Sequence, residues 1–313
     1  MFAAAQAHLS PANCEALLRD GYVVCDGFPL ASELRGEVLE LSRAGVLGPN
    51  RTSFGPYVFV KPHIEEADLH DPRLRHLLPG LPRLTAWFEE SAGSFAQALS
   101  AGLPGLQISA GARAVKVQVN RGSGGCFPVH YDNPGPPSRR AVTLLLYLNP
   151  GWKPEDGGEL VLMPFLQPEV VLAPLHGRAV FFLADRVAHR VLPSHAERLM
   201  MTTWFDGLAV NAPADINLSL PPTALSDMPA TAAALRASGL QRSVSRAVYA
   251  EEYDASLMEC MQGTGGEVLE GMTQAHEQHL ASVQRNAPLR RLVDELRRMK
   301  PPGRAQLLPS VDG

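Results

Sequence analysis

Short apolar runs alternate with clusters of Gly, Pro, Asn and Asp through the middle of the chain, from Val115 to Asp206. The runs are rich in β-branched and aromatic residues, a pattern typical of consecutive short strands. Eight such strands suffice for a double-sheet jelly roll, a fold whose mouth can hold a small ligand. The pattern predicts a mainly β core with strands near residues 113–120, 126–132, 141–149, 159–164, 168–173, 178–184, 187–192 and 198–205.

Helical patterns precede this core. Ser10 and Pro11 supply a capping residue and a proline at the first helical position, so we expect a helix to begin there and a strand to follow at Tyr22-Val23-Val24. Apolar residues at near-helical spacing predict a second helix from about Ala31 to Ala44 and a third near Leu81 to Leu99. The segment between these two helices holds Pro, Gly and mixed charge, and we expect it to be irregular.

The strand pattern ends after Gly207. Residues 209–230 are rich in Pro, Ala, Ser and Thr, which is typical of a linker. The sequence therefore divides into residues 1–208, a domain built around the β core, and residues 209–313, a linker with a helical extension that is partly disordered from Pro301 onward. Helices are expected at Thr231–Glu252, broken by Gly239, and at Thr273–Lys300, broken by Pro288.

The last expected helix is basic and amphipathic. Its apolar stripe is Leu289, Leu292 and Leu296, and four arginines accompany the stripe. Such a helix can bind a membrane surface or an acidic partner, but an apolar stripe packed against its own domain with a solvated basic face is more common. If the stripe packs in this way, it covers apolar surface of the β core.

Composition narrows the range of partners and locations. The chain has 28 basic and 32 acidic residues and a pI near 6.2, so it lacks the overall charge of a nucleic-acid-binding protein. No secretory signal and no apolar run of the roughly 18 residues that a membrane helix needs can be found. The four cysteines, which form no CxxC pair, make a disulfide framework unexpected and favour a reducing compartment. We therefore expect a cytoplasmic or nuclear protein. The four cysteines are Cys14, Cys25, Cys126 and Cys260.

The sequence His130-Tyr131-Asp132, followed by His189 and Arg198, carries the candidate chemistry. Side chains two residues apart on a strand share a face, so His130 and Asp132 can point at one metal while Tyr131 points away. A second strand would bring His189 to the same point, and a third, paired antiparallel with the second through the turn at 192–197, would add Arg198. Two imidazoles and a carboxylate can hold Fe(II) with open positions for a co-substrate and O2. An arginine that binds a carboxylate through two nitrogens suits a 2-oxoacid as that co-substrate.

These motifs and their spacing resemble the catalytic domain of the Fe(II)/2-oxoglutarate-dependent prolyl 4-hydroxylases, most closely the oxygen-sensing branch that acts on hypoxia-inducible factor. The resemblance implies a double-stranded β-helix, or jelly roll, with an N-terminal helical buttress against one sheet. It does not extend to the C-terminal extension. The matching motifs are His130-Tyr131-Asp132-Asn133-Pro134, Arg140 with Thr143, Tyr147-Leu148-Asn149, Gly157-Gly158, Asp185-Arg186, and His189 with Arg198.

The resemblance also implies a role for individual residues. His130, Asp132 and His189 would be the iron ligands, Arg198 would pair with the distal carboxylate of 2-oxoglutarate, and Tyr147 would donate a hydroxyl hydrogen bond to it. Thr202 and Trp204 would line the same pocket. Asn120 departs from the pattern, because the oxygen-sensing enzymes usually have a tyrosine there, and this puts the tightness of co-substrate binding in doubt.

The implied activity is hydroxylation of a prolyl residue in a protein substrate, with release of succinate and CO2. Fe(II), 2-oxoglutarate and O2 would be required, with ascorbate as the reductant, and we expect a monomer. Residues 47–72 would contact the polypeptide substrate, although a plain surface connection explains them equally well.

Several alternatives stay open from the residues themselves. Tyr147 can be a buried core tyrosine, and Cys126 can be either an oxidisable cavity residue or a small buried hydrophobe. His176, His195, His276 and His279 are expected to be ordinary surface or core residues. At the level of function, a hydroxylase of a small molecule or of another side chain, a nucleic-acid demethylase and a non-catalytic sensor of oxygen or 2-oxoglutarate are the rivals.

Overall fold

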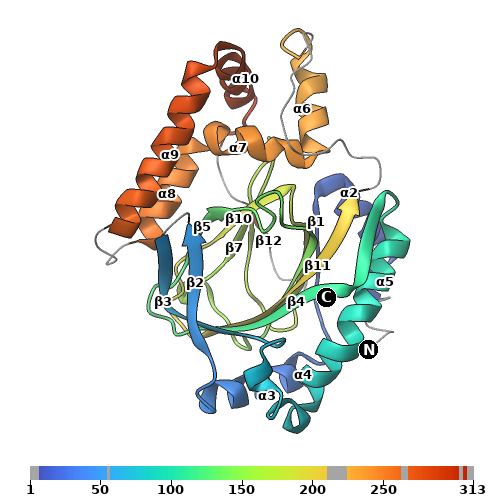
Figure 1. Ribbon diagram of the computed structural model, residues 1–313. Helices are drawn as coiled ribbons and strands as arrows, with labels where there is room; N and C mark the ends of the chain where they lie inside the picture. The colour runs from blue at the N-terminus through green and yellow to red at the C-terminus, as the bar shows by residue number, and fades with distance from the viewer. Residues whose placement is uncertain (1–6, 55–56, 210–223, 262–266, 303–305, 309–313) are drawn as a thin grey trace.

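Two facing β-sheets form the centre of the protein (Figure 1). The computed structural model describes residues 7–54, 57–209, 224–261, 267–302 and 306–308. The larger sheet has the strand order β1-β9-β6-β11-β4-β3-β2, with β1 at Tyr22–Cys25, β2 at Gly48–Phe54, β3 at Tyr57–Asp68, β4 at Leu106–Asn120, β6 at Arg140–Tyr147, β9 at Ala179–Leu183 and β11 at Arg198–Ala209. The smaller sheet has the order β12-β8-β7-β10-β5, with β5 at Phe127–His130, β7 at Leu160–Pro164, β8 at Val170–Leu172, β10 at Val187–Val191 and β12 at Gln306–Leu308.

All eight predicted core strands are present, and the predicted jelly roll is confirmed. One expected feature of the core is wrong, because β10 and β11 are not paired. β10 pairs with β5 and β7 in the smaller sheet, whereas β11 pairs with β4 and β6 in the larger one. The turn at residues 192–197 therefore carries the chain from one sheet to the other, so that Arg198 begins a strand of the sheet that faces the one with His189.

The segment from Leu47 to Pro72 is also not irregular as expected. It contains the hairpin of β2 and β3, which extends the larger sheet at one edge. Phe59 is buried between the exposed Val58 and Val60, which is the alternation of a half-buried strand. In the sequence, Gly55, Pro56 and the proline at position 62 interrupt the apolar pattern and conceal this strand.

The N-terminal helices cover the outer face of the larger sheet. Leu17, Leu34 and Leu41 from these helices share one apolar core with Val117 and Phe181 of the sheet. Ser10 caps the first helix as predicted, since its Oγ accepts a hydrogen bond from the backbone N–H of Asn13. The predicted buttress is confirmed; it consists of α2 at Pro11–Asp20, α3 at Ala31–Arg43, α4 at Pro82–Ala86, a π-helix at Trp87–Ser91 and α5 at Ala92–Gly102.

The C-terminal helices cover the smaller sheet, on the opposite side of the strands in Figure 1. Val129 of β5 and Val161 of β7 share a core with the fully buried Leu292 and Leu296, so the apolar stripe does pack against its own domain. The expected break near Pro288 occurs at Asn286, which caps a new helix. The helices are α6 at Met228–Arg236, α7 at Arg242–Val248, α8 at Ala250–Cys260, α9 at Glu267–Arg285 and α10 at Ala287–Arg298.

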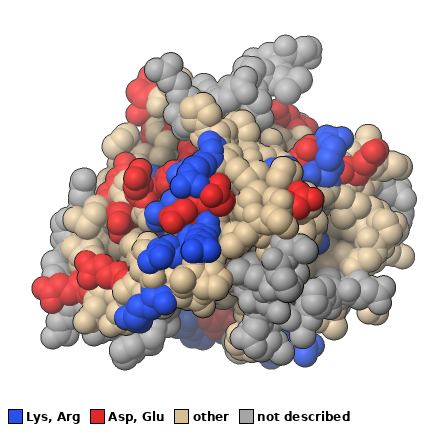
Figure 2. All heavy atoms as spheres, turned by 90° about the horizontal axis from the view of Figure 1, so that it is seen from above, with Lys and Arg blue, Asp and Glu red and all other residues tan. Residues whose placement is uncertain are grey.

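Two of the basic residues of α10 are engaged locally. Arg297 donates to the backbone oxygen of Ala247, and Arg298 forms an ion pair with Glu295. On the face seen from above in Figure 2, basic and acidic side chains are interspersed and no patch of a single sign dominates. Within the described part of the chain, no helix combines the length and the apolar character that a membrane span requires.

The end of the chain differs from the expected disorder in one place. Residues 306–308 form β12, which pairs in parallel with β8 at the edge of the smaller sheet. The predicted linker falls largely on residues 210–223, which lie outside the described residues.

One disulfide joins Cys126, next to β5, to Cys260 at the end of α8. This pairing contradicts the expectation that the cysteines form no disulfide, while Cys14 and Cys25 are free. The backbone N–H of Val129 also donates to Ser256 Oγ at 3.0 Å. Helix α8 is thus attached covalently and by a hydrogen bond to the strand that ends in His130.

Candidate metal and co-substrate site

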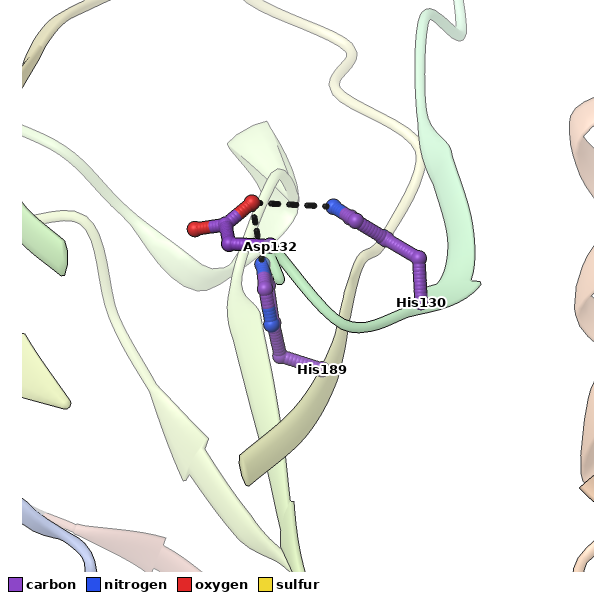
Figure 3. A group of neighbouring side chains, drawn as sticks. All are labelled: His130, Asp132 and His189. Carbon is purple, nitrogen blue, oxygen red and sulfur yellow. Dashed lines mark ion pairs between the residues drawn. The ribbon is translucent and has the colours of Figure 1, made fainter. Parts of the chain in front are cut away.

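The three predicted metal ligands lie together at the mouth of the jelly roll (Figure 3). His130 ends β5 and lies opposite His189 of β10 in the ladder, and Asp132 follows just beyond the strand. Asp132 Oδ1 is 3.6 Å from His130 Nε2 and 3.8 Å from His189 Nε2, and the candidate ligand atoms all lie within 4.8 Å of one another. Tyr131 points the other way, as predicted, and donates to Ser245 Oγ on α7.

Neighbouring groups fix the orientation of each ligand. His130 Nδ1 donates to the backbone oxygen of Pro128 at 2.8 Å, and His189 Nδ1 approaches that of Val187 at 3.4 Å, so both Nε2 atoms are left for a metal. Thr143 Oγ1 donates to Asp132 Oδ2 at 2.7 Å and leaves Oδ1 facing the histidines. Sequence analysis assigned Thr143 no role beyond its place in a family motif, and only the close approach of β6 to Asp132 reveals this hydrogen bond.

The protonation states also suit a metal ion. Burial raises the pKa of Asp132, but the two histidines and the hydrogen bond from Thr143 more than offset it and hold the pKa well below its usual range. Burial and the neighbouring His130 lower the pKa of His189 to about 4. An ionised carboxylate and neutral imidazoles are the forms that bind metals. A set of two histidines and one carboxylate with open positions is typical of non-haem Fe(II).

A buried cation without an anion lies beside Met200, a residue that lines the cavity of the metal site. Arg198 at the start of β11 is only 2% exposed, and its Nη1 donates to Met200 Sδ, whereas Nε and Nη2 have no hydrogen-bond partner among the described residues. The guanidinium lies 5.0 Å from the centre of the Tyr147 ring, and the buried Tyr147 hydroxyl is likewise unpartnered within the described part of the chain. Burial lowers the pKa of Arg198 and raises that of Tyr147. Because an unpaired buried charge costs several kcal/mol, this pair fits a carboxylate ligand such as the distal end of 2-oxoglutarate.

Two glycines make room for Arg198. Gly157 and Gly158 precede β7 in left-handed conformations, with φ of 63° and 78°. A Cβ on Gly158 would lie 2.8 Å from Arg198 Cδ, and one on Gly157 would lie 2.4 Å from the Pro193 carbonyl oxygen. The double glycine of the motif therefore lets this turn pack directly against the arginine and the crossing between the sheets.

The remaining predicted residues occupy different places. Thr202 and Trp204 lie on the same face of β11 as Arg198, and both line the cavity. The Trp204 ring stacks on the guanidinium of Arg140, whose Cζ lies 4.1 Å from the ring centre. Asn120 pairs with Arg198 in the ladder but does not line the cavity. Its Nδ2 donates to Gly125 O and its Oδ1 accepts from the N–H of Gly122, so both ends of the amide hold the turn after β4.

The cavity around this site has a volume of about 770 Å³ and extends well beyond the jelly roll. The β2–β3 hairpin forms one wall through Asn50, Arg51, Phe59, Lys61 and Glu66. The C-terminal helices form another wall through Arg242, Arg246, Tyr253, Leu257, Met272, His276 and His279. His276 and His279, which were expected to be ordinary surface or core residues, lie on this wall, and no motif in the helices marks their place there.

Comparison with known proteins identifies the family. Residues 115–206 match the 2OG-Fe(II) oxygenase superfamily. A crystal structure of a prolyl 4-hydroxylase from Phytophthora capsici is 43% identical in sequence and superposes with a TM-score of 0.81, covering 96% of this chain and 95% of the other. The chain belongs to the prolyl 4-hydroxylase family. The family predicted from the motifs is thus confirmed.

Two more distant relatives match parts of the chain. Prolyl hydroxylase EGLN3 of Mus musculus is 37% identical over 87 residues, which are 27% of this chain and 36% of the mouse protein. The chain thus spans about a third of the length of that relative. A prolyl hydroxylase from Trichoplax adhaerens, in complex with a peptide of the oxygen degradation domain of hypoxia-inducible factor, is 26% identical with a TM-score of 0.54 and covers 64% of this chain.

Proposed function

We propose that this protein is an Fe(II)- and 2-oxoglutarate-dependent dioxygenase that hydroxylates a prolyl residue of a protein substrate, with release of succinate and CO2. The observation that carries the proposal is that the His130, Asp132 and His189 cluster and the buried, unpartnered Arg198 and Tyr147 belong to one jelly roll, in which Met200 contacts Arg198 and also lines the cavity of the cluster. Membership of the prolyl 4-hydroxylase family supports a prolyl substrate.

Some of these residues would bind the iron or 2-oxoglutarate, and others would orient the residues that bind. His130, Asp132 and His189 would hold the iron, and Thr143 would keep the carboxylate of Asp132 in place. Arg198 would bind the distal carboxylate of 2-oxoglutarate through its free nitrogens, with a neutral hydrogen bond from Tyr147. When bound, iron and 2-oxoglutarate supply the oxidation of a C–H bond by O2.

The outer cavity would receive the polypeptide. A peptide substrate requires an open groove beside the iron, and the groove lies between the β2–β3 hairpin and the C-terminal helices. The Trichoplax relative binds a peptide, and this supports a protein or peptide substrate here. Substrate recognition by residues 47–72 is supported by the hairpin residues that line the cavity, including Phe59 and Lys61.

Ascorbate as reductant, a monomeric state and a role in oxygen sensing belong to the same proposal. Described residues of a single chain form the site and its walls, and this supports an active monomer. A cytoplasmic or nuclear location stays a prediction from the sequence. The Cys126–Cys260 disulfide argues against this location, because disulfides are rare in reducing compartments.

The test is to incubate iron-loaded protein with 2-oxoglutarate, O2, ascorbate and a proteome extract, and to map the gain of one oxygen atom by mass spectrometry. We expect modified prolines that depend on 2-oxoglutarate and that are missing when the His189→Ala variant is used. Modification of a metabolite, a nucleobase or another side chain in place of proline would refute the prolyl assignment.

A further inference from the structure

The walls of the active-site cavity carry the opposite charge to the chain as a whole. The chain has a net charge of −4. The cavity, in contrast, is lined by six basic side chains and only two acidic ones, Glu66 and Asp132, of which Asp132 belongs to the proposed iron site. The basic residues come from three parts of the chain and are Arg51, Lys61, Lys116, Arg140, Arg242 and Arg246.

Some of these charges are neutralised locally. Lys116 forms an ion pair with Glu66 at 2.6 Å, so the only acidic residue of the outer wall is already engaged. Arg140 stacks on Trp204, and Arg242 donates to the backbone oxygen of Asn133. These interactions orient the two guanidinium groups but do not cancel their charge.

Arg246 on α7 is held in position by a histidine. Its Nε donates to His276 Nδ1 at 2.9 Å, which requires an imidazole with a free lone pair at Nδ1. His276 is buried, and its Nε2 lies 3.3 Å from Asp254 Oδ1. Tyr253, stacked against His276, lies beside the same guanidinium. Arg246 lines the cavity, and within the described part of the chain its hydrogen bond is the one that Nε donates to His276.

The opposite wall presents a second available cation. Arg51 on β2 is exposed at the cavity rim and has no hydrogen bond or ion pair to any residue that the structure describes. Arg51 and Arg246 thus belong to elements far apart in the sequence, and the groove between their walls leads to the proposed iron site. A guanidinium with free nitrogens recognises carboxylates by paired hydrogen bonds.

We propose that this groove selects prolyl segments flanked by acidic residues, with Arg246 and Arg51 as the residues that bind the substrate carboxylates. The proposal rests on the proposed function, because it names the substrate class of the same site. Attraction of 2-oxoglutarate itself does not account for these charges, since Arg198 already provides the buried partner for that dianion. Charge complementarity also accelerates the encounter with an acidic substrate and weakens as salt screens it.

The first experiment uses a pool of synthetic peptides, each with one proline between randomised flanks. The iron-loaded protein with 2-oxoglutarate and O2 is expected to hydroxylate preferentially the peptides that carry Asp or Glu near the proline. Sequencing of the modified peptides shows the preference directly. Random flanks, or flanks enriched in Lys and Arg, would overturn the inference while leaving prolyl hydroxylation intact.

The second experiment measures equilibrium binding without turnover. A glutamate-flanked prolyl peptide and its glutamine twin are titrated into anaerobic protein that holds iron and 2-oxoglutarate. We expect the acidic peptide to bind about tenfold more tightly at low salt and to lose most of this advantage at high salt. Equal binding of the two peptides would contradict the inference, whereas selective binding with no hydroxylation in the first experiment would refute only the prolyl activity.

Variants assign the preference to the two arginines. Arg246→Gln should reduce the advantage of the acidic peptide by roughly threefold to tenfold, and Arg51→Gln, at an exposed position, tests the same preference without disturbing buried groups. Arg290→Gln is the matched control, because Arg290 is exposed on α10 and does not line the cavity. If both cavity variants kept the full advantage, or if the control lost it equally, these arginines would not be the carboxylate partners.

Discussion

The jelly-roll strands and the C-terminal helices both contribute to one cavity, but they contribute different chemistry. The strands between residues 115 and 206 supply every candidate ligand of the metal and of 2-oxoglutarate. The helices after residue 224 supply arginine, histidine and tyrosine side chains at the entrance. The core therefore holds the candidate site of oxidation, which is common to the superfamily, and the helices form part of the entrance, where we propose that the substrate is chosen.

The N-terminal helices show that covering a sheet does not by itself give access to the site. They bury the outer face of the larger sheet, yet no residue described in α2 to α5 lines the cavity. The smaller sheet carries His130 at the end of β5 and His189 in the middle of β10, so helices that cover this sheet also reach the rim of the site. Because the C-terminal helices lie next to the strands that carry the candidate ligands, they cover the sheet and are also placed for the proposed role in substrate recognition.

The largest expected effect is on the chemistry of the core. His130→Ala, Asp132→Ala or His189→Ala should each abolish 2-oxoglutarate turnover while the protein stays folded, because these side chains line a cavity and do not fill the apolar core. Succinate production and bound iron are measured together, with circular dichroism as the control for folding. A variant with near-native turnover and an unchanged iron content would exclude that residue as a ligand.

The next effect concerns the co-substrate. Arg198→Ala should remove most of the affinity for 2-oxoglutarate, and Arg198→Lys should lower it because the planar fork is lost although the charge remains. Tyr147→Phe is the matched smaller change, since it removes one neutral hydrogen bond and should cost on the order of 1 kcal/mol. Calorimetric titration of 2-oxoglutarate ranks the three variants, and a larger loss in Tyr147→Phe than in Arg198→Ala would reverse the assignment.

The core site could be predicted because its signals are local. Alternating apolar residues and turn residues mark each strand, and His130, Asp132 and Arg198 stand in motifs that the family shares. The pairing of strands is not local, and so the sheet that β11 joins was predicted wrongly. Thr143 was missed for the same reason, since its role depends on which strand lies beside Asp132.

The helical side of the entrance could not be predicted from the sequence. His276 and Arg246 lie on different helices, and only the packing of α9 against α7 brings them together. The disulfide joins cysteines that are 134 residues apart, a pairing that spacing alone does not reveal. A relative that shares these helices is therefore informative, and the Phytophthora structure, which covers 96% of the chain, includes most of them.

Removal of the C-terminal helices tests directly whether the strand core suffices for turnover and whether the helices bind the peptide. A chain that ends at Pro222 keeps every candidate ligand, so we expect it to retain 2-oxoglutarate turnover per folded, iron-loaded molecule but to lose affinity for peptide. Its melting temperature should fall, because Val129, Met163 and Phe165 on the smaller sheet would lose their cover, and a fully buried apolar side chain contributes roughly 1.5–3 kcal/mol.

A point variant separates the loss of stability from the loss of the cavity wall that the C-terminal helices form. Leu296→Ala should destabilise the protein by about 2–5 kcal/mol without changing the peptide preference, since Leu296 is buried away from the cavity. Thermal unfolding and succinate formation are compared for both proteins. A well-folded truncated chain without turnover would show that the helices complete the catalytic site, and the comparison between the two regions would fail.

The smallest expected effect comes from the hairpin wall, where Lys61 is buried in contact with the Phe127 ring. Burial lowers the pKa of Lys61 to about 7, and the charges of Glu66 and Lys116 modify it in opposite directions. Below pH 7 the lysine is charged in both the folded and the unfolded chain, so the full cost of burying the charge is present. As the pH rises from about 7 towards the unfolded value near 10.5, the folded state has lost the proton while the unfolded state still binds it, and stability increases.

Lys61→Met removes this dependence and keeps an apolar side chain on Phe127. We expect it to stabilise the protein by roughly 1–3 kcal/mol near pH 6 and by much less near pH 10, because the wild-type protein gains stability over this range and the variant does not. Urea unfolding of both proteins at the two pH values measures the difference. An equal change in the free energy of unfolding at both pH values would mean that Lys61 keeps an ordinary pKa in the folded protein. Burial in the hairpin wall would then not disfavour the charged form of the lysine.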